Sequence, residues 1–241
     1  MDFEEFFTGI NFRFIKPETF LPDKFNLVDN IFKKAFNFSI EAYITQFPIE
    51  DSYIKSEFKE LCKIPKMSTL ALGAIINYGV KQLPSDQVFV NIGVWNGFTF
   101  LSGLLNNPNK ICIGVDNFSE FGGPRGDFLK RFDRLKSKNH FFYDLDYNEY
   151  FKDYHKGKIG FYIYDGEHSY DNQLKGLQIA EPYLEKNSII LVDDTNWGYP
   201  RQATLDFMEK SKEDYDIIFD VVTHSTVHPT FWNGVMILRK K

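Results

Sequence analysis

The sequence predicts an α/β protein built on a Rossmann-like, doubly wound sheet of seven strands. Short apolar runs alternate with segments of helical periodicity from about residue 67 to residue 210. This alternation is typical of parallel strands joined by right-handed helical crossovers. The last two apolar runs follow one another with no helix between them, which predicts a C-terminal antiparallel hairpin that closes the sheet.

Residues 1–65 precede this alternation, and we expect them to form a helical N-terminal cap or arm ahead of a main domain at residues 66–241. Prolines divide the arm, and two helices are expected within it, near residues 24–36 and 49–62. The arm is rich in phenylalanine, whose rings must be buried on the main domain, over a ligand or against a second copy of the chain. A homo-oligomer formed through the arm is therefore one expectation.

The main domain is expected to begin with a helix at residues 67–83, for which Ser68 and Thr69 are candidate N-caps. The strands are then expected at residues 88–92, 111–115 and 140–143, at two runs that begin at Phe161 and Ile189, and at residues 216–222 and 231–239. The helices between them are expected at residues 98–105, 126–135, 147–154, 170–184 and 201–210.

Composition excludes several classes of protein. The net charge of -5 argues against a nucleic-acid backbone as the main partner, because no basic block offsets the acidic residues. The two cysteines, Cys62 and Cys112, do not indicate a disulfide framework. The acidic N-terminus does not fit a signal peptide, and no apolar run reaches the ~20 residues of a membrane span. We therefore expect a cytoplasmic protein with no membrane partner.

Two strands that stop at acidic residues carry the strongest functional signal. The run from Phe161 ends at Asp165, and the run from Ile189 ends at Asp193 and Asp194, one helix later. Neighbouring parallel strands lie about 4.8 Å apart, so the three carboxylates are expected to crowd one small volume. Oxygen ligands suit a hard cation, which makes Mg²⁺ the expected metal. The alternative is that these acids cap helices or form surface ion pairs.

Two of the residues that follow Asp165 are candidate bases. His168 lies three residues after Asp165 and is expected to face the same space, where a neutral imidazole can take a proton near pH 7. Its alternative role is that of a helix-start histidine hydrogen-bonded to Asp193. Glu167 is the second candidate base.

A glycine turn follows the first expected strand. Gly93 and Gly97 form a G-x-x-x-G pattern, while the G-x-G-x-x-G pattern that usually binds a dinucleotide pyrophosphate is absent. Asp116 ends the second strand, where an acid commonly accepts hydrogen bonds from ribose hydroxyls. Asp144 ends the third strand and is a candidate for the adenine side, although either acid is also able to cap the next helix.

These motifs resemble the class I S-adenosylmethionine-dependent methyltransferases, and in particular the metal-dependent macrocin O-methyltransferase group. The resemblance covers roughly residues 67–240. It is carried by Gly93-Val-Trp-Asn-Gly97, Asp116-Asn-Phe118, Asp165-Gly-Glu-His-Ser-Tyr170, Val192-Asp-Asp194 and Arg201-Gln-Ala203.

The resemblance implies a set of ligand contacts. The cofactor S-adenosylmethionine would contact the glycine turn, the ribose acid, the adenine acid and the first metal acid: Asn91, Gly93, Trp95, Gly97, Thr99, Asp116, Asn117, Asp144 and Asp165. Mg²⁺ would be bound by Asp165, Asp193 and Asp194, with His168 or Glu167 as the base. Asn91 and Asn96 depart from the family, which usually has an acid and an arginine at these positions.

The expected function is therefore Mg²⁺-assisted O-methylation of a hydroxyl group on a small molecule or sugar. One alternative is a catalytically degenerate S-adenosylmethionine-binding or scaffold protein, which Asn91 and Asn96 leave open. A less favoured alternative is a nicotinamide-dependent reductase, against which the missing dinucleotide motif argues.

Overall fold

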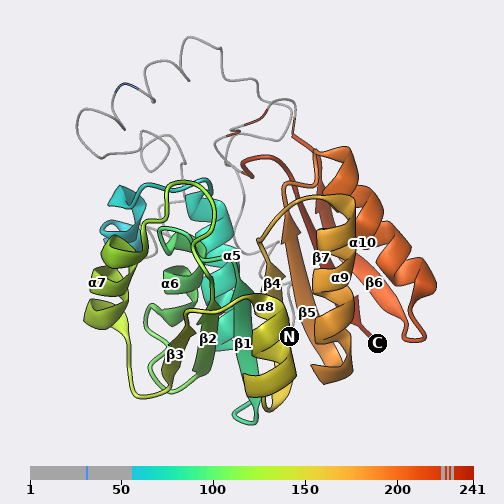
Figure 1. Cartoon of the computed structure of the whole chain (residues 1–241), viewed down its shortest axis with the longest axis horizontal. Helices are drawn as coiled ribbons and strands as arrows, with labels where there is room; N and C mark the ends of the chain where they lie inside the picture. Colours follow the sequence, from blue (N-terminus) through green and yellow to red (C-terminus); the bar gives the residue numbers. More distant parts are fainter. Residues whose placement is uncertain (1–30, 32–55, 224–225, 227, 229–230) are drawn as a thin grey trace.

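A computed structural model of the chain describes residues 31, 56–223, 226, 228 and 231–241. Seven strands in this part form one sheet in the order β3-β2-β1-β4-β5-β7-β6 (Figure 1). They are β1 Gln87–Ile92, β2 Ile111–Val115, β3 His140–Tyr143, β4 Lys158–Tyr164, β5 Leu184–Asp193, β6 Tyr215–Val221 and β7 Val235–Lys240. The α-helices are α5 Leu70–Lys81, α6 Phe98–Leu104, α7 Arg125–Leu135, α8 Tyr147–Glu149, α9 Tyr170–Ala180 and α10 Gly198–Lys210.

The sheet confirms the Rossmann-like fold. The five strands β1 to β5 pair in parallel, and β7 is antiparallel to both β5 and β6. Strand β1 lies between β2 and β4, so the strand order reverses at the β1–β4 pair. In such sheets the ligand site lies beyond the carboxyl ends of the strands at this reversal.

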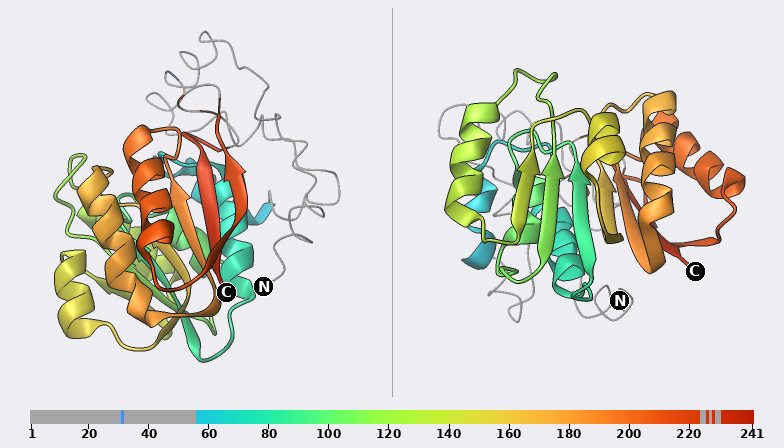
Figure 2. Two further views of the ribbon diagram at one scale, coloured as in Figure 1. Left: turned by 90° about the vertical axis from the view of Figure 1, so that its right-hand side faces the viewer. Right: turned by 60° about the horizontal axis from the view of Figure 1, so that its bottom comes forward.

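Helices cover both faces of the sheet, as Figure 2 shows for α5 on one side and α9 and α10 on the other. Alternate side chains of a strand point to opposite faces. Phe89 and Phe161 therefore lie in the core with the residues of α5, α6 and α7, while Val90 and Tyr162 lie in the core with those of α9 and α10. Because these strands are buried on both faces, apolar residues occupy consecutive positions in their sequences.

Helix α5 begins as its sequence predicts, with a threonine cap. The hydroxyl of Thr69 accepts a hydrogen bond from the backbone N–H of Leu72 at 3.2 Å. Thr69 is thus the N-cap, and Ser68, the other candidate, lies outside the helix.

The boundary between α9 and β5 differs from the expected one. The helix ends at Ala180, and a 3₁₀ turn, Glu181–Tyr183, joins it to a strand that begins at Leu184 rather than at Ile189. Pro182 in this turn lacks the N–H that a longer helix needs. Leu184 then pairs with Ile159 of β4, which extends the strand beyond its apolar part.

The end of the expected N-terminal arm contributes to the core. Phe58, Leu61, Cys62 and Ile64 are buried against the residues of α5. A 3₁₀ helix, Leu61–Lys63, lies here, at the end of the helix expected near residues 49–62. The helix expected near residues 24–36 lies outside the described residues, apart from Ile31. No helix in the described part of the chain is long and apolar enough to span a bilayer.

Candidate active site

A cavity of about 520 Å³ lies at the carboxyl ends of four parallel strands. Its walls include Gly93 after β1, Asp116 after β2, Asp165 after β4 and Asp194 after β5. Because these strands surround the reversal of strand order, the cavity occupies the position where this fold binds ligands.

The glycine turn after β1 packs tightly against the end of β4. Gly93 has a φ of +77°, and a Cβ atom added to it would lie 1.8 Å from the backbone oxygen of Asp165. Gly97 has a φ of +99°, and a Cβ atom there would lie 2.7 Å from the ring of Phe128. Both positions therefore require glycine, for conformation and for space.

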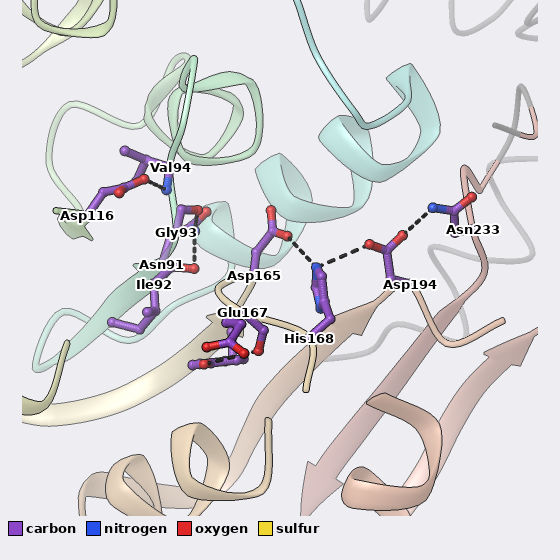
Figure 3. Close-up of polar contacts among 11 residues, drawn as sticks. Asn91, Ile92, Gly93, Val94, Asp116, Asp165, Glu167, His168, Asp194 and Asn233 are labelled. Carbon is purple, nitrogen blue, oxygen red and sulfur yellow. Dashed lines mark hydrogen bonds and ion pairs between the residues drawn. The ribbon is translucent and has the colours of Figure 1, made fainter. Parts of the chain in front are cut away.

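Asp116 holds the glycine turn in place. Its Oδ2 accepts a hydrogen bond from the backbone N–H of Val94 at 2.7 Å (Figure 3). The same oxygen accepts from the backbone N–H of Trp95, also at 2.7 Å. Its Oδ1 accepts a third from the N–H of Phe118 at 2.6 Å. A carboxylate has about four acceptor positions, so Asp116 can hold this turn and still accept from a ligand hydroxyl in the cavity.

Other predicted cofactor residues around this turn also line the cavity. Trp95, Thr99 and Asn117 are part of its wall. The indole N–H of Trp95 donates to the backbone oxygen of Phe121 at 3.1 Å, which fixes the ring at the cavity. The side-chain oxygen of Asn117 accepts from the N–H of Ser119 at 3.1 Å.

Two predicted cofactor residues lie outside the cavity wall. Asn91 is fully buried, and its amide donates to the backbone oxygens of Ile92 and Gly93 at 3.2 and 2.8 Å (Figure 3). Its side chain therefore stabilises the end of β1 from outside the cavity. Asp144 instead forms an ion pair with Arg125, and Asp146, two residues later, lines the cavity.

The acids of β4 and β5 meet around His168, as Figure 3 shows. The imidazole Nε2 of His168 lies 3.1 Å from Asp194 Oδ2 and 3.8 Å from Asp165 Oδ1. Ligand atoms of Asp165, His168 and Asp193 all lie within 4.8 Å of one another. Asp193 is only 5% exposed, and its Oδ1 has no hydrogen-bond partner among the described residues.

Burial raises the pKa of both Asp165 and Asp193 well above the ordinary value, and repulsion between neighbouring carboxylates raises both further. Burial also raises the pKa of Asp194, although His168 and the amide of Asn233 oppose this effect. Closely packed carboxyl groups of this kind favour a bound proton or a cation between them.

Sequence predicts Asp165, Asp193 and Asp194 as one set of metal ligands, and all three line the cavity. Ligand atoms of Asp165 and Asp193 lie close to His168, and Asp194 lies beside this group. Asp194 has a φ of +54° directly after β5, and its carboxylate contacts His168 and Asn233.

The second candidate base is engaged elsewhere. Glu167 lines the cavity, and its carboxylate accepts a hydrogen bond from the amide of Asn172 at 2.5 Å. Beside the acid cluster, the ring of Trp197 lies edge-on to His168 with centroids 5.7 Å apart. Trp197 is 44% exposed and also lines the cavity.

Several cavity residues have no signal in the sequence that would have identified them. They are Lys66 and Ser68 before α5, Asp146 and Tyr147 after β3, and Trp232 and Asn233 before β7. Each stands close to the end of a helix or strand, but none belongs to a recognisable motif. Only the arrangement of the elements brings them to the cavity.

Comparison with known proteins agrees with this arrangement. Residues 90–195 match the protein family described as a methyltransferase domain. This segment extends from β1 to two residues beyond β5 and includes the glycine turn, Asp116 and the acid cluster. No curated protein sequence matches the chain.

Two solved structures illustrate the shared fold. Cofactor-bound Rv0187 from MTB is 11% identical, with a TM-score of 0.57 over 91% of this chain and 98% of that chain. The O-methyltransferase from Bacillus cereus in complex with SAH is 11% identical, with a TM-score of 0.56 over 89% of this chain and 97% of that chain.

The methyltransferase match does not favour the reductase or the degenerate scaffold protein. The chain thus contains a segment, residues 90–195, that matches a methyltransferase domain, and this segment lies within a Rossmann-like fold.

Proposed function

We propose that the chain transfers a methyl group from S-adenosylmethionine to a hydroxyl group of a small molecule or sugar, with the assistance of Mg²⁺. The observation that carries this proposal is the position of His168 between Asp165 and Asp194, in the cavity that the glycine turn also lines. The Bacillus cereus enzyme, which shares the fold, was solved in complex with SAH.

The cavity suits an adenosyl cofactor. Its volume of about 520 Å³ lies within the range of small-molecule sites. Asp116 offers acceptors for ribose hydroxyls, and the turn from Gly93 to Gly97 allows close approach of a ligand to the backbone. Trp95 and Thr99 complete this part of the wall.

The acid cluster suits a divalent cation. Asp165 and Asp193 supply carboxylate oxygens, one of which is buried without a hydrogen-bond partner in the described part of the chain. Asp194, the third ligand that the sequence predicts, lies beside them and completes the set. When bound, S-adenosylmethionine supplies an electrophilic methyl group and Mg²⁺ lowers the pKa of a hydroxyl group.

His168 is the proposed base. A proton that its Nε2 takes from the acceptor hydroxyl is stabilised by Asp194 at 3.1 Å. Asn233 in turn donates to Asp194 and holds it in position. Catalysis in this scheme depends mainly on positioning and on the exclusion of water from the cavity.

The acceptor is proposed to lie against Trp197. This ring is next to His168 and partly exposed, and an aromatic face of this kind suits a sugar or another ring. The net charge of -5 does not favour a nucleic acid as the acceptor. We also propose a cytoplasmic location, with which the free thiols of Cys62 and Cys112 are compatible. The N-terminal arm remains the proposed contact of a homo-oligomer.

Calorimetry tests the proposal directly. Titration of the full chain with S-adenosylmethionine, with and without Mg²⁺, is expected to release or absorb heat, whereas titration with NADH is not. A product-mass screen over hydroxylated acceptors should then detect a gain of one methyl group. Absence of S-adenosylmethionine binding in both metal conditions would contradict the proposal.

A further inference from the structure

Lys66 is a buried cation in the cavity wall. Lys66 is only 7% exposed and lines the cavity. Its ammonium donates a hydrogen bond to the backbone oxygen of Cys62 at 3.0 Å. The ammonium also lies 5.4 Å from the centroid of the Phe98 ring. No carboxylate lies within ion-pair distance of it among the residues that the structure describes.

This environment compensates the charge only in part. A buried ammonium without a counterion is costly. An ammonium carries three donors, and only one of them has an acceptor among the described residues. The ring of Phe98 offers some cation–π stabilisation but does not replace an anion. An anionic group of a ligand in the cavity would complete the site.

Ser68 supplies a second unused donor in the same wall. It is 4% exposed, and its buried hydroxyl has no hydrogen-bond partner in the part of the chain that the structure describes. The cause is the capping of α5 by Thr69, which leaves the hydroxyl of Ser68 free of that role. Buried hydroxyl groups are normally hydrogen-bonded, so Ser68 also points to a ligand.

We propose that Lys66 and Ser68 bind a ligand carboxylate, which accepts from the ammonium and from the hydroxyl. Such charge-assisted hydrogen bonds are roughly twice as strong as neutral ones. The identification of the ligand as the cofactor rests on the proposed function, whereas the anion site itself does not.

The position of this site favours the amino-acid part of the cofactor as the source of the carboxylate. Phe98, whose ring lies beneath Lys66, directly follows Gly97 of the glycine turn. Asn91 is turned away behind that turn and supplies no charge to the cavity. A carboxylate on the methyl acceptor is the other source of the same chemistry.

Calorimetry on variants of the full chain separates the two sources. The ligands are SAH and its decarboxylated form, which differ only in the carboxylate. Lys66→Met is expected to raise the Kd for SAH about 10- to 100-fold and the Kd for the decarboxylated form less than about 3-fold. Ser68→Ala should raise the Kd for SAH about 3- to 10-fold, and Lys66→Arg, which keeps the charge, should bind nearly as well as the wild type.

A carboxylate from the acceptor gives a different pattern. The Kd for SAH is then unchanged in Lys66→Met, but acetate binds to the wild type saturated with SAH and not to the variant. If the wild type binds neither form of the cofactor product, the proposed function fails, and the acetate titration without SAH still decides whether Lys66 binds an anion.

Two results would overturn the proposal. One is equal binding of SAH and of acetate by the wild type and Lys66→Met. The other is an equal loss of both cofactor forms together with a lower melting temperature of the ligand-free variant, which would show a purely structural role. Ser68→Ala removes only one hydroxyl group and so retains a readout if Lys66→Met does not fold.

Discussion

Asn233 donates a hydrogen bond of 2.7 Å to Asp194, although 39 positions separate them in the sequence. The contact exists because β7 pairs with β5 and places Val235 opposite Asp193. The other oxygen of Asp194 lies 3.1 Å from His168, so Asn233 reaches the proposed base through one carboxylate. The antiparallel strand thus helps to build the site.

Replacement of Asn233 is expected to weaken catalysis without weakening cofactor binding. Asn233→Ala removes the donor that orients Asp194, and we expect kcat to fall about tenfold. The Kd for S-adenosylmethionine should change less than about twofold, because the substitution removes no hydrogen bond to the cofactor. Steady-state kinetics and calorimetry check this, with Gln202→Ala, which removes a surface bond to Asp206, as the control. Equal kcat values in both variants would contradict the positioning role.

The two candidate bases should respond differently to substitution. His168→Asn is expected to lower kcat by about 10²- to 10⁴-fold, the usual contribution of a positioned base. Glu167→Gln should lower it less than about tenfold, because Glu167 bonds to Asn172 rather than to the acid cluster. The pH–rate profile of each variant is the measurement, and a larger loss in Glu167→Gln would exchange the two roles.

Metal removal should make stability depend on pH. The pKa values of Asp165 and Asp193 are raised above 3.8, so these groups contribute stability that is fully present below the unfolded pKa. That contribution is lost as pH rises through their folded pKa values. In a chelator, the melting temperature should therefore fall with rising pH, and Asp193→Asn should fall less steeply.

Added Mg²⁺ should reverse this trend, because it binds the deprotonated carboxylates. Melting curves with and without Mg²⁺ across pH 5 to 8, a range chosen to cover raised carboxyl pKa values, test both parts. Identical melting temperatures with and without Mg²⁺ at the upper end of this range would argue against the metal site.

The glycine turn offers a matched pair of substitutions. Gly93 and Gly122 have similar φ angles of +77° and +79°, but only Gly93 has a backbone atom where a Cβ would lie. Gly122→Ala should cost about 1 kcal/mol through its backbone conformation alone, whereas Gly93→Ala should cost about 3 kcal/mol or more. Urea denaturation measures both, and equal losses would show that the clash at Gly93 relaxes easily.

The sequence by itself determined the layered fold and the identity of most strands. The strands at residues 111–115 and 140–143 have the predicted bounds, because apolar runs that end at polar residues are a local property of the chain. Asp116, Asp165, Asp193 and Asp194 could be assigned to the cavity edge for the same reason, since parallel strands end together.

Tertiary structure alone decided how those residues meet. The left-handed backbone of Asp194 turns it toward His168, and the pairing of β7 with β5 supplies Asn233. Lys66 became a buried cation only because the segment before α5 packs beside α6. A periodic pattern determines which face of an element is buried, but side-chain partners beyond its ends depend on backbone torsions and on strands that are distant in the sequence.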